Sequence, residues 1–136
     1  MTVNASKNGN VILCVDDEAI GLSARKMLLE SQGYRVLTAE NGADALVLFS
    51  TEDVEAVILD YSMPGMNGDV VAERMKELRP DLPIIMLSAY VDLPSETLAL
   101  VDKSITKGEP PRGLLDAIAQ LLDGNRKIHS KAVSAN

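Results

Sequence analysis

Short runs of consecutive apolar residues alternate along the chain with longer segments in which apolar residues recur every three or four positions. The short runs, rich in Val, Ile and Leu, are typical of strands buried on both faces, and the longer segments are typical of amphipathic helices. The runs predict strands at residues 11–15, 34–39, 55–59, 83–87 and 103–106. The longer segments predict helices between Asp17 and Gly33 and at residues 41–50, 68–78, 94–101 and 110–122.

The periodicity also predicts which side of each of the first two helices is buried. In the first helix the predicted buried residues are Ile20, Ala24, Met27 and Leu28. In the second helix they are Ala45, Leu46 and Phe49. Gly33 is suited to the position after a helix end, where a left-handed backbone conformation is common.

Five strands that alternate with five helices predict a parallel α/β sheet covered by helices on both faces. Right-handed crossovers then bring the carboxyl end of every strand to the same edge of the sheet. At 136 residues the chain has the length of a single domain. We expect this domain at residues 10–123, after a flexible N-terminus at residues 1–9. A flexible tail at residues 124–136 is expected to follow, with three basic residues and no acidic one.

The composition narrows the function. A net charge of −7 and an isoelectric point of about 4.6 argue against nucleic-acid binding through a basic face. One cysteine excludes an intramolecular disulfide and suits a reducing compartment. No apolar run has the length of a signal peptide or a membrane span, so we expect a cytoplasmic protein without membrane insertion.

Polar and charged residues stand where the predicted strands end. Asp16 and Asp17 follow the first strand, and Asp60 follows the third. Ser88 follows the fourth strand and Lys107 follows the fifth. Because ligands of open parallel sheets bind beyond the carboxyl ends of the strands, we expect these five residues to form one site.

Three neighbouring carboxylates repel each other, by about 1 kcal/mol per pair in water and about 4 kcal/mol near a protein surface. A hard cation such as Mg²⁺ relieves that repulsion and is commonly held by carboxylates and water. One carboxylate oxygen can then attack phosphorus while the metal and Lys107 offset the charge of the phosphoryl oxygens and Ser88 donates a hydrogen bond to them. The product is an aspartyl phosphate.

The chain resembles the receiver domain of two-component response regulators over about residues 10–123. Four sequence motifs carry this resemblance, in the expected order and at the expected strand ends. They are VDDE at residues 15–18, LDYSMPGMNG at 59–68, LSA at 87–89 and ITK at 105–107. The resemblance implies a flavodoxin-like fold with five parallel strands in the order 2-1-3-4-5, with the fourth helix shortened here.

The resemblance also implies roles for individual residues. Asp60 is expected to be the phosphoacceptor. Asp17, Asp60 and the backbone carbonyl of Ser62 are expected to bind Mg²⁺, and Asp16 to act mainly through a bound water. Lys107 is expected to hold the phosphoryl group.

Ser88 is expected to hold the phosphoryl group as well, and the implied donor is a histidine kinase or a histidine phosphotransfer protein. The chain is then a stand-alone signalling switch similar to chemotaxis regulators, and not an enzyme in the usual sense. It is expected to catalyse only its own phosphotransfer and dephosphorylation, and to signal to a downstream protein by phosphorylation-dependent contact. No effector domain follows in this sequence, so no transcriptional output is expected from it.

Three departures from the family lie in the half of the domain that the family uses for output. Gly108 follows Lys107, where the family usually has proline. Ser104 stands where the family usually has a Tyr or Phe that turns inward on phosphorylation. Only 19 positions separate Ser88 from Lys107, about one helical turn fewer than expected. Tyr90 is the candidate for the missing aromatic switch.

Two other functions compete with that of a receiver. A receiver-like docking module that works without phosphorylation would agree with the altered fourth helix and loop. A phosphatase of the haloacid-dehalogenase type also forms an aspartyl phosphate, but it needs an Asp-x-Asp motif, and Asp16 and Asp17 are adjacent. A nucleotide-binding P-loop is excluded, because the sequence has no Gly-x₄-Gly-Lys.

Overall fold

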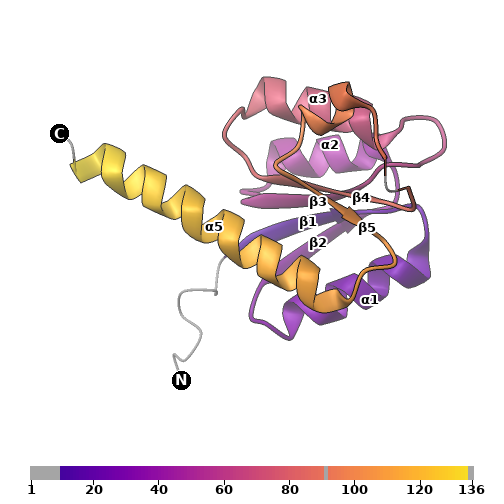
Figure 1. Cartoon of the computed structure of the whole chain (residues 1–136), viewed down its shortest axis with the longest axis horizontal. Coiled ribbons are helices and arrows are strands. Elements are labelled where there is room, and N and C mark those ends of the chain that lie inside the picture. The colour runs from indigo at the N-terminus through magenta and orange to yellow at the C-terminus, as the bar shows by residue number, and fades with distance from the viewer. Residues whose placement is uncertain (1–9, 91, 135–136) are drawn as a thin grey trace.

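The computed structural model describes residues 10–90 and 92–134 and contains a five-stranded parallel sheet in the order β2-β1-β3-β4-β5 (Figure 1). The strands are β1 (Val11–Val15), β2 (Arg35–Ala39), β3 (Ala56–Asp60), β4 (Ile84–Ser88) and β5 (Lys103–Thr106). The helices are α1 (Ala19–Glu30), α2 (Gly42–Thr51), α3 (Gly68–Leu78), α4 (Ser95–Leu98) and α5 (Pro111–Ser134). The predicted flavodoxin-like fold is confirmed, and residues 1–9, predicted as a flexible N-terminus, lie outside the described residues.

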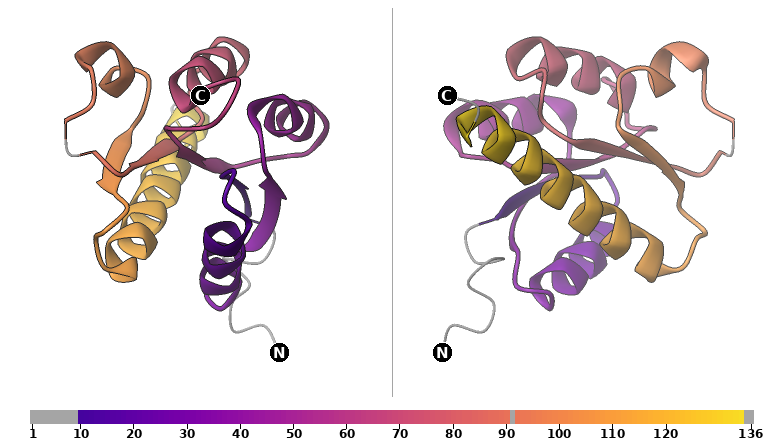
Figure 2. Two further views of the ribbon diagram at one scale, coloured as in Figure 1. Left: turned by 90° about the vertical axis from the view of Figure 1, so that its right-hand side faces the viewer. Right: turned by 60° about the vertical axis from the view of Figure 1, so that its left-hand side comes forward.

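Two helical layers cover the sheet, α1 and α5 on one face and α2, α3 and α4 on the other (Figure 2). The central strands β1, β3 and β4 are buried along their whole length, which explains why their residues are apolar except for Asp60 and Ser88 at the ends of β3 and β4. Successive side chains alternate between the two layers. Leu13 of β1 packs in the core beneath α2 and α3, whereas Ile12 and Cys14 pack beneath α1 and α5.

The predicted buried side of α1 was wrong. Ile20 and Met27 are 87% and 72% exposed, and the buried residues of this helix are Leu22 and Leu29. The inward side also carries Arg25, whose charge interrupts the apolar periodicity that the prediction used. In α2, by contrast, Ala45 and Phe49 are buried as predicted, and Leu46 packs partly buried against the same core.

The predicted end of the last helix at residue 122 was also wrong, since α5 continues to Ser134 and extends beyond the sheet (Figure 1). Gly124 costs a helix about 1 kcal/mol relative to alanine but does not end it, and no proline follows. The other predicted boundaries agree with the structure to within a few residues. The greatest shortening is in α4, which spans four residues. No helix in the described part of the chain is both long enough and apolar enough to cross a membrane.

A polar network fixes β5 against the rest of the sheet despite the shortness of α4. Lys76 Nζ of α3 donates to the carbonyl of Leu82 at 2.8 Å and to Asp102 Oδ2 at 3.1 Å. The same Asp102 oxygen accepts from the backbone N–H of Ile84 at 2.8 Å. The backbone N–H of Asp102 in turn donates to the Ile84 carbonyl at 2.9 Å. Asp102 therefore ties the beginnings of β4 and β5 together, one residue before β5 starts.

This network predicts a stability loss for Asp102→Ala. The substitution leaves the buried N–H of Ile84 without its carboxylate acceptor and breaks the Lys76 ion pair. We expect a loss of about 1–2 kcal/mol in the free energy of unfolding, measured by urea denaturation. Asp81→Ala is the control, because Asp81 is exposed in the loop before β4. An equal loss in both variants would contradict the role of the network.

Candidate functional site

The residues predicted from the strand ends lie together at one edge of the sheet. Asp16 comes directly after β1, Asp60 and Ser88 are the last residues of β3 and β4, and Lys107 comes directly after β5. The parallel register brings these ends to the same height, with Ser88 opposite Thr106. The backbone N–H of Lys107 also donates to the Ser88 carbonyl at 2.8 Å.

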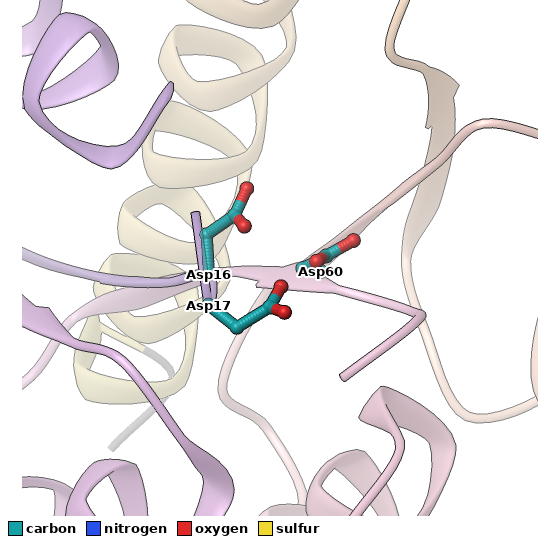
Figure 3. Close-up of side chains that lie close together, drawn as sticks. All are labelled: Asp16, Asp17 and Asp60. Carbon is teal, nitrogen blue, oxygen red and sulfur yellow. The ribbon is translucent and has the colours of Figure 1, made fainter. Parts of the chain in front are cut away.

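Three carboxylates form an acidic cluster at this edge. One oxygen each of Asp16, Asp17 and Asp60 lies within 4.8 Å of the other two (Figure 3). Asp16 and Asp60 are 1% and 2% exposed, whereas Asp17 is exposed. Carboxylate oxygens are ligands that Mg²⁺ prefers, and an exposed carboxylate leaves room for the waters that this ion keeps. The donor set therefore fits the metal that the sequence predicted.

Lys107 supplies a positive charge to the cluster. Its Nζ lies 3.0 Å from Asp60 Oδ1, 3.5 Å from Asp16 Oδ2 and 3.8 Å from Glu18 Oε1. The loop that follows contains Gly108 where the family has proline, and Glu109 closes this loop. The carboxylate of Glu109 accepts from the N–H of Thr106 at 2.9 Å, and its own N–H donates to the Thr106 carbonyl at 3.0 Å. The altered loop thus keeps the lysine directed at Asp60.

The surroundings of Asp60 and Asp16 shift the pKa values of these two carboxyl groups in opposite directions. Burial raises the pKa of Asp60 to about 6, although the hydrogen bond from Lys107 and a backbone hydrogen bond from Ser62 oppose this shift. Burial also acts to raise the pKa of Asp16, but the hydrogen bond from Glu18 N–H and the charges of Arg25 and Lys107 outweigh it and lower the pKa. In Lys107, burial lowers the pKa, and the contact with Asp60 more than reverses this effect.

A close backbone approach holds the loop after Asp60. The N–H of Gly68 donates to the Tyr61 carbonyl at 2.8 Å, and a β-carbon at Gly68 would lie only 2.3 Å from the Asp60 carbonyl oxygen. Any other residue at this position would displace the loop. Asn67 Oδ1 accepts a hydrogen bond from the Met63 N–H at 3.3 Å, and this bond links the two ends of the turn at residues 63–67. Asn67 and Gly68 were not predicted to have such a role, and their signal in the sequence is the Asn-Gly pair at the start of α3.

Arg25 is the site residue that the sequence analysis missed. Its guanidinium donates from Nη2 to Asp16 Oδ2 and forms an ion pair with it. The signal in the sequence is its spacing, three residues after Leu22 and four before Leu29, both of which are buried. A basic side chain at that position of an otherwise apolar face points into the molecule.

A hydrogen bond joins the side chain of Ser88 to the backbone of Tyr90. Ser88 is 1% exposed, and its Oγ accepts from the N–H of Tyr90 at 2.9 Å, which leaves the hydroxyl proton to donate elsewhere. The Tyr90 side chain is 61% exposed.

Two other serines belong to the predicted site or its switch. Ser104, in the place of the family's aromatic residue, is half-buried on β5. Ser62 is exposed in the loop beside Asp60.

Comparison with known proteins agrees with this geometry. A model of the response regulator receiver domain matches residues 12–119. Response regulator SaeR of Staphylococcus aureus (strain USA300) is 33% identical over 125 residues, which are 90% of this chain and 54% of SaeR. The chain therefore spans about half the length of the curated relatives it matches.

Two solved structures are similar over most of the chain. A CheY-like receiver domain protein from Methanospirillum hungatei JF-1 has 32% identity and a TM-score of 0.81, covering 87% of this chain and 97% of that one. Response regulator TrrA of Thermotoga maritima, solved in complex with Mg²⁺-BeF, has 34% identity and a TM-score of 0.79. That similarity covers 82% of this chain and 98% of TrrA.

The burial of Asp60 predicts that Asp60→Asn stabilises the metal-free protein at pH 7. A folded-state pKa of about 6 lies above the ordinary pKa of 3.8 for an aspartate in water, so the folded state binds the extra proton and stability falls as pH rises between these values. Asparagine avoids this loss. We expect its free energy of unfolding to exceed that of the wild type by about 1–3 kcal/mol at pH 7, with the difference shrinking towards pH 4.

Urea denaturation in Mg²⁺-free buffer at several pH values measures this difference, with Asp81→Asn as an exposed control. A wild type more stable than Asp60→Asn at pH 7 would show that the Lys107 ion pair outweighs the burial of the charge.

Proposed function

Because the chain belongs to the response regulator receiver family, we propose that it is a phosphorylation switch in which Asp60 accepts a phosphoryl group from a phosphohistidine donor. The observation that carries this proposal is the contact of 3.0 Å between Lys107 Nζ and Asp60 Oδ1, at the edge of a three-carboxylate cluster. A buried carboxylate with a lysine beside it at the open edge of a parallel sheet can act as a nucleophile on an incoming phosphoryl group.

The proposed transfer is a displacement at phosphorus. A carboxylate oxygen of Asp60 forms the new P–O bond while the P–N bond of the donor phosphohistidine breaks. The electron pair of that bond stays on the histidine nitrogen, which then takes up a proton from solvent. The product is a mixed anhydride on Asp60, and the donor is a histidine kinase or a histidine phosphotransfer protein.

The neighbouring residues hold the group that is transferred. Asp17, Asp60 and the backbone carbonyl of Ser62 would bind Mg²⁺, with Asp16 acting through water, and the bound ion supplies positive charge to the phosphoryl oxygens. Lys107 is directed at the same place from β5, and Ser88 has a hydroxyl proton available to donate.

The output is proposed to be a phosphorylation-dependent contact with a downstream protein, made by a stand-alone receiver in the cytoplasm. The support for a receiver without a further domain is that the similarity covers 97% and 98% of the two solved chains. Ser104 cannot supply an aromatic ring, so the nearby Tyr90, bonded through its N–H to Ser88, is proposed as the residue that reports the state of the site. We do not assign the chain an effector of its own.

A second candidate function is docking without phosphorylation. The observation that favours it is the region of β4, α4 and β5, in which α4 has four residues and Ser104 replaces the aromatic switch. The complete acidic cluster and the placement of Lys107 favour the phosphorylation switch over this alternative.

Phosphorylation at Asp60 predicts one mass adduct. Incubation with acetyl phosphate and Mg²⁺ should add a single phosphoryl group to the wild type, detected by intact-protein mass spectrometry, and none after removal of Mg²⁺ with a chelator. Asp60→Asn should give no adduct, and Asp53→Asn, which changes an exposed carboxylate, should behave as the wild type. An adduct that persists in Asp60→Asn would place the chemistry elsewhere, and loss of the adduct in all three proteins would favour docking.

We also propose that the Tyr90 ring shields the acyl phosphate from water, and this role predicts a shorter lifetime of the phosphorylated state in Tyr90→Ala. Loss of the ring removes a shield between the acyl phosphate and water, so dephosphorylation should be roughly two- to tenfold faster. Decay of the mass adduct with time measures this rate. Leu98→Ala, which removes an exposed apolar side chain from α4, should leave it unchanged. Equal lifetimes of Tyr90→Ala and the wild type would remove Tyr90 from the mechanism.

A further inference from the structure

Arg25 places a second positive charge in the acidic cluster, from a helix that contributes no other side chain to the predicted site. We propose that Arg25 is a built-in competitor of the divalent cation, which occupies Asp16 when the metal is absent and thereby weakens Mg²⁺ binding. This inference rests on the proposed Mg²⁺ site and adds to it a residue that sets the affinity.

Both carboxylate oxygens of Asp16 already have partners in the protein. Asp16 Oδ1 accepts from the backbone N–H of Glu18 at 2.9 Å. Asp16 Oδ2 accepts from Arg25 Nη2 and lies 3.5 Å from Lys107 Nζ. A cation or its bound water can approach Oδ2 only by sharing this oxygen with the guanidinium or by displacing it. Asp17 is exposed, and no basic side chain of residues 10–90 and 92–124 forms an ion pair with it.

The geometry of α1 directs Arg25 to this place. Side chains of a helix lean towards its N-terminus, so Arg25 covers the turn that contains Gly21. A β-carbon at Gly21 would lie 3.7 Å from both Nη1 and Nη2 of Arg25, which is ordinary contact distance. Any side chain larger than alanine would compete with the guanidinium for this space. Glycine is unfavourable inside a helix, and here it leaves the path from Arg25 to Asp16 open.

The net charge of the cluster indicates how Arg25 changes the affinity for a divalent cation. Three carboxylates against Lys107 alone leave two negative charges for a divalent cation, whereas Lys107 and Arg25 together leave one. The attraction between the site and a divalent cation falls accordingly. Arg25 thus supplies part of the charge neutralisation that a bound divalent cation would supply.

The guanidinium of Arg25 borders a cavity into which it can move. Arg25 lines a cavity of about 340 Å³ between α1 and the β5–α5 connection, and Glu109 lies on the wall of the same cavity. The side chain of Arg25 is 17% exposed, so it reaches solvent through this opening. Displacement by a cation therefore needs a side-chain rotation and no change of the fold.

Isothermal titration with Mg²⁺ at pH 7 tests the proposal. Arg25→Met keeps the aliphatic length and removes the charge, and we expect its Mg²⁺ affinity to exceed that of the wild type by about tenfold. Lys26→Met is the matched control. It removes one positive charge from the next position of the same helix, where Lys26 is half exposed and paired with Glu30 at 3.3 Å, and it should bind Mg²⁺ as the wild type does.

Thermal unfolding with and without Mg²⁺ separates competition from a structural role. Arg25→Met should unfold at a lower temperature than the wild type in a chelator, because Asp16 loses a partner, and Mg²⁺ should raise its unfolding temperature by more than that of the wild type. A residue that serves the fold alone would lower both temperatures equally. Arg25→Gln, also neutral but able to donate a hydrogen bond, should show the same tighter binding and covers the case in which Arg25→Met does not fold.

The outcomes are distinct. Equal Mg²⁺ affinity of the wild type and both folded Arg25 variants, or weaker binding by the variants, would overturn the inference and leave the phosphorylation switch standing. An equal gain in Lys26→Met would also overturn it, since net charge would then be the cause. Absence of Mg²⁺ binding in every protein would overturn the metal site of the proposed function, and the inference with it.

Discussion

The main electrostatic constraint on this structure is the repulsion between three carboxylates, whose oxygens lie within 4.8 Å of one another at the edge of the sheet. The ion pair between Lys107 and Asp60, at 3.0 Å, is the interaction on which the arrangement depends. It joins the ends of β3 and β5 and places a positive charge where the charge of a transferred phosphoryl group would develop. Without such a cation, burial of Asp60 and Asp16 side by side would favour protonation of one of them.

The fold provides this arrangement at a cost to its own stability. A parallel sheet brings every carboxyl strand end to one edge, and the register of β1, β3, β4 and β5 sets the distances between the residues there. Burial keeps the pKa of Asp60 near 6, so the ionised nucleophile is less favourable in the folded chain than in water. A cation or a phosphoryl group bound at such a site would change this unfavourable electrostatic energy, which suits the switch that we propose.

Most of the fold and the members of the site followed from the sequence, because each depends on local signals. Apolar runs marked the strands, and the polar residue at each strand end identified Asp16, Asp60, Ser88 and Lys107. The strand order came from the family resemblance, not from the pattern. The inward side of α1 and the position of Arg25 were not predictable in this way, because a charged residue on a buried face interrupts the periodicity that identifies the face. The end of α5 was missed because a glycine inside a helix costs only about 1 kcal/mol relative to alanine, and α5 tolerates Gly124.

In the proposed function, residues from four strand ends act as one phosphoryl-binding site, and backbone amide spectra recorded by NMR during titration with Mg²⁺ and then beryllofluoride test this claim. We predict chemical-shift changes that begin at Asp17 and Asp60 with Mg²⁺ alone. With beryllofluoride, which mimics the phosphoryl group on aspartate, they should extend to Ser88, Tyr90 and Lys107. Changes confined to one strand end, or spread over residues far from this edge, would contradict the claim.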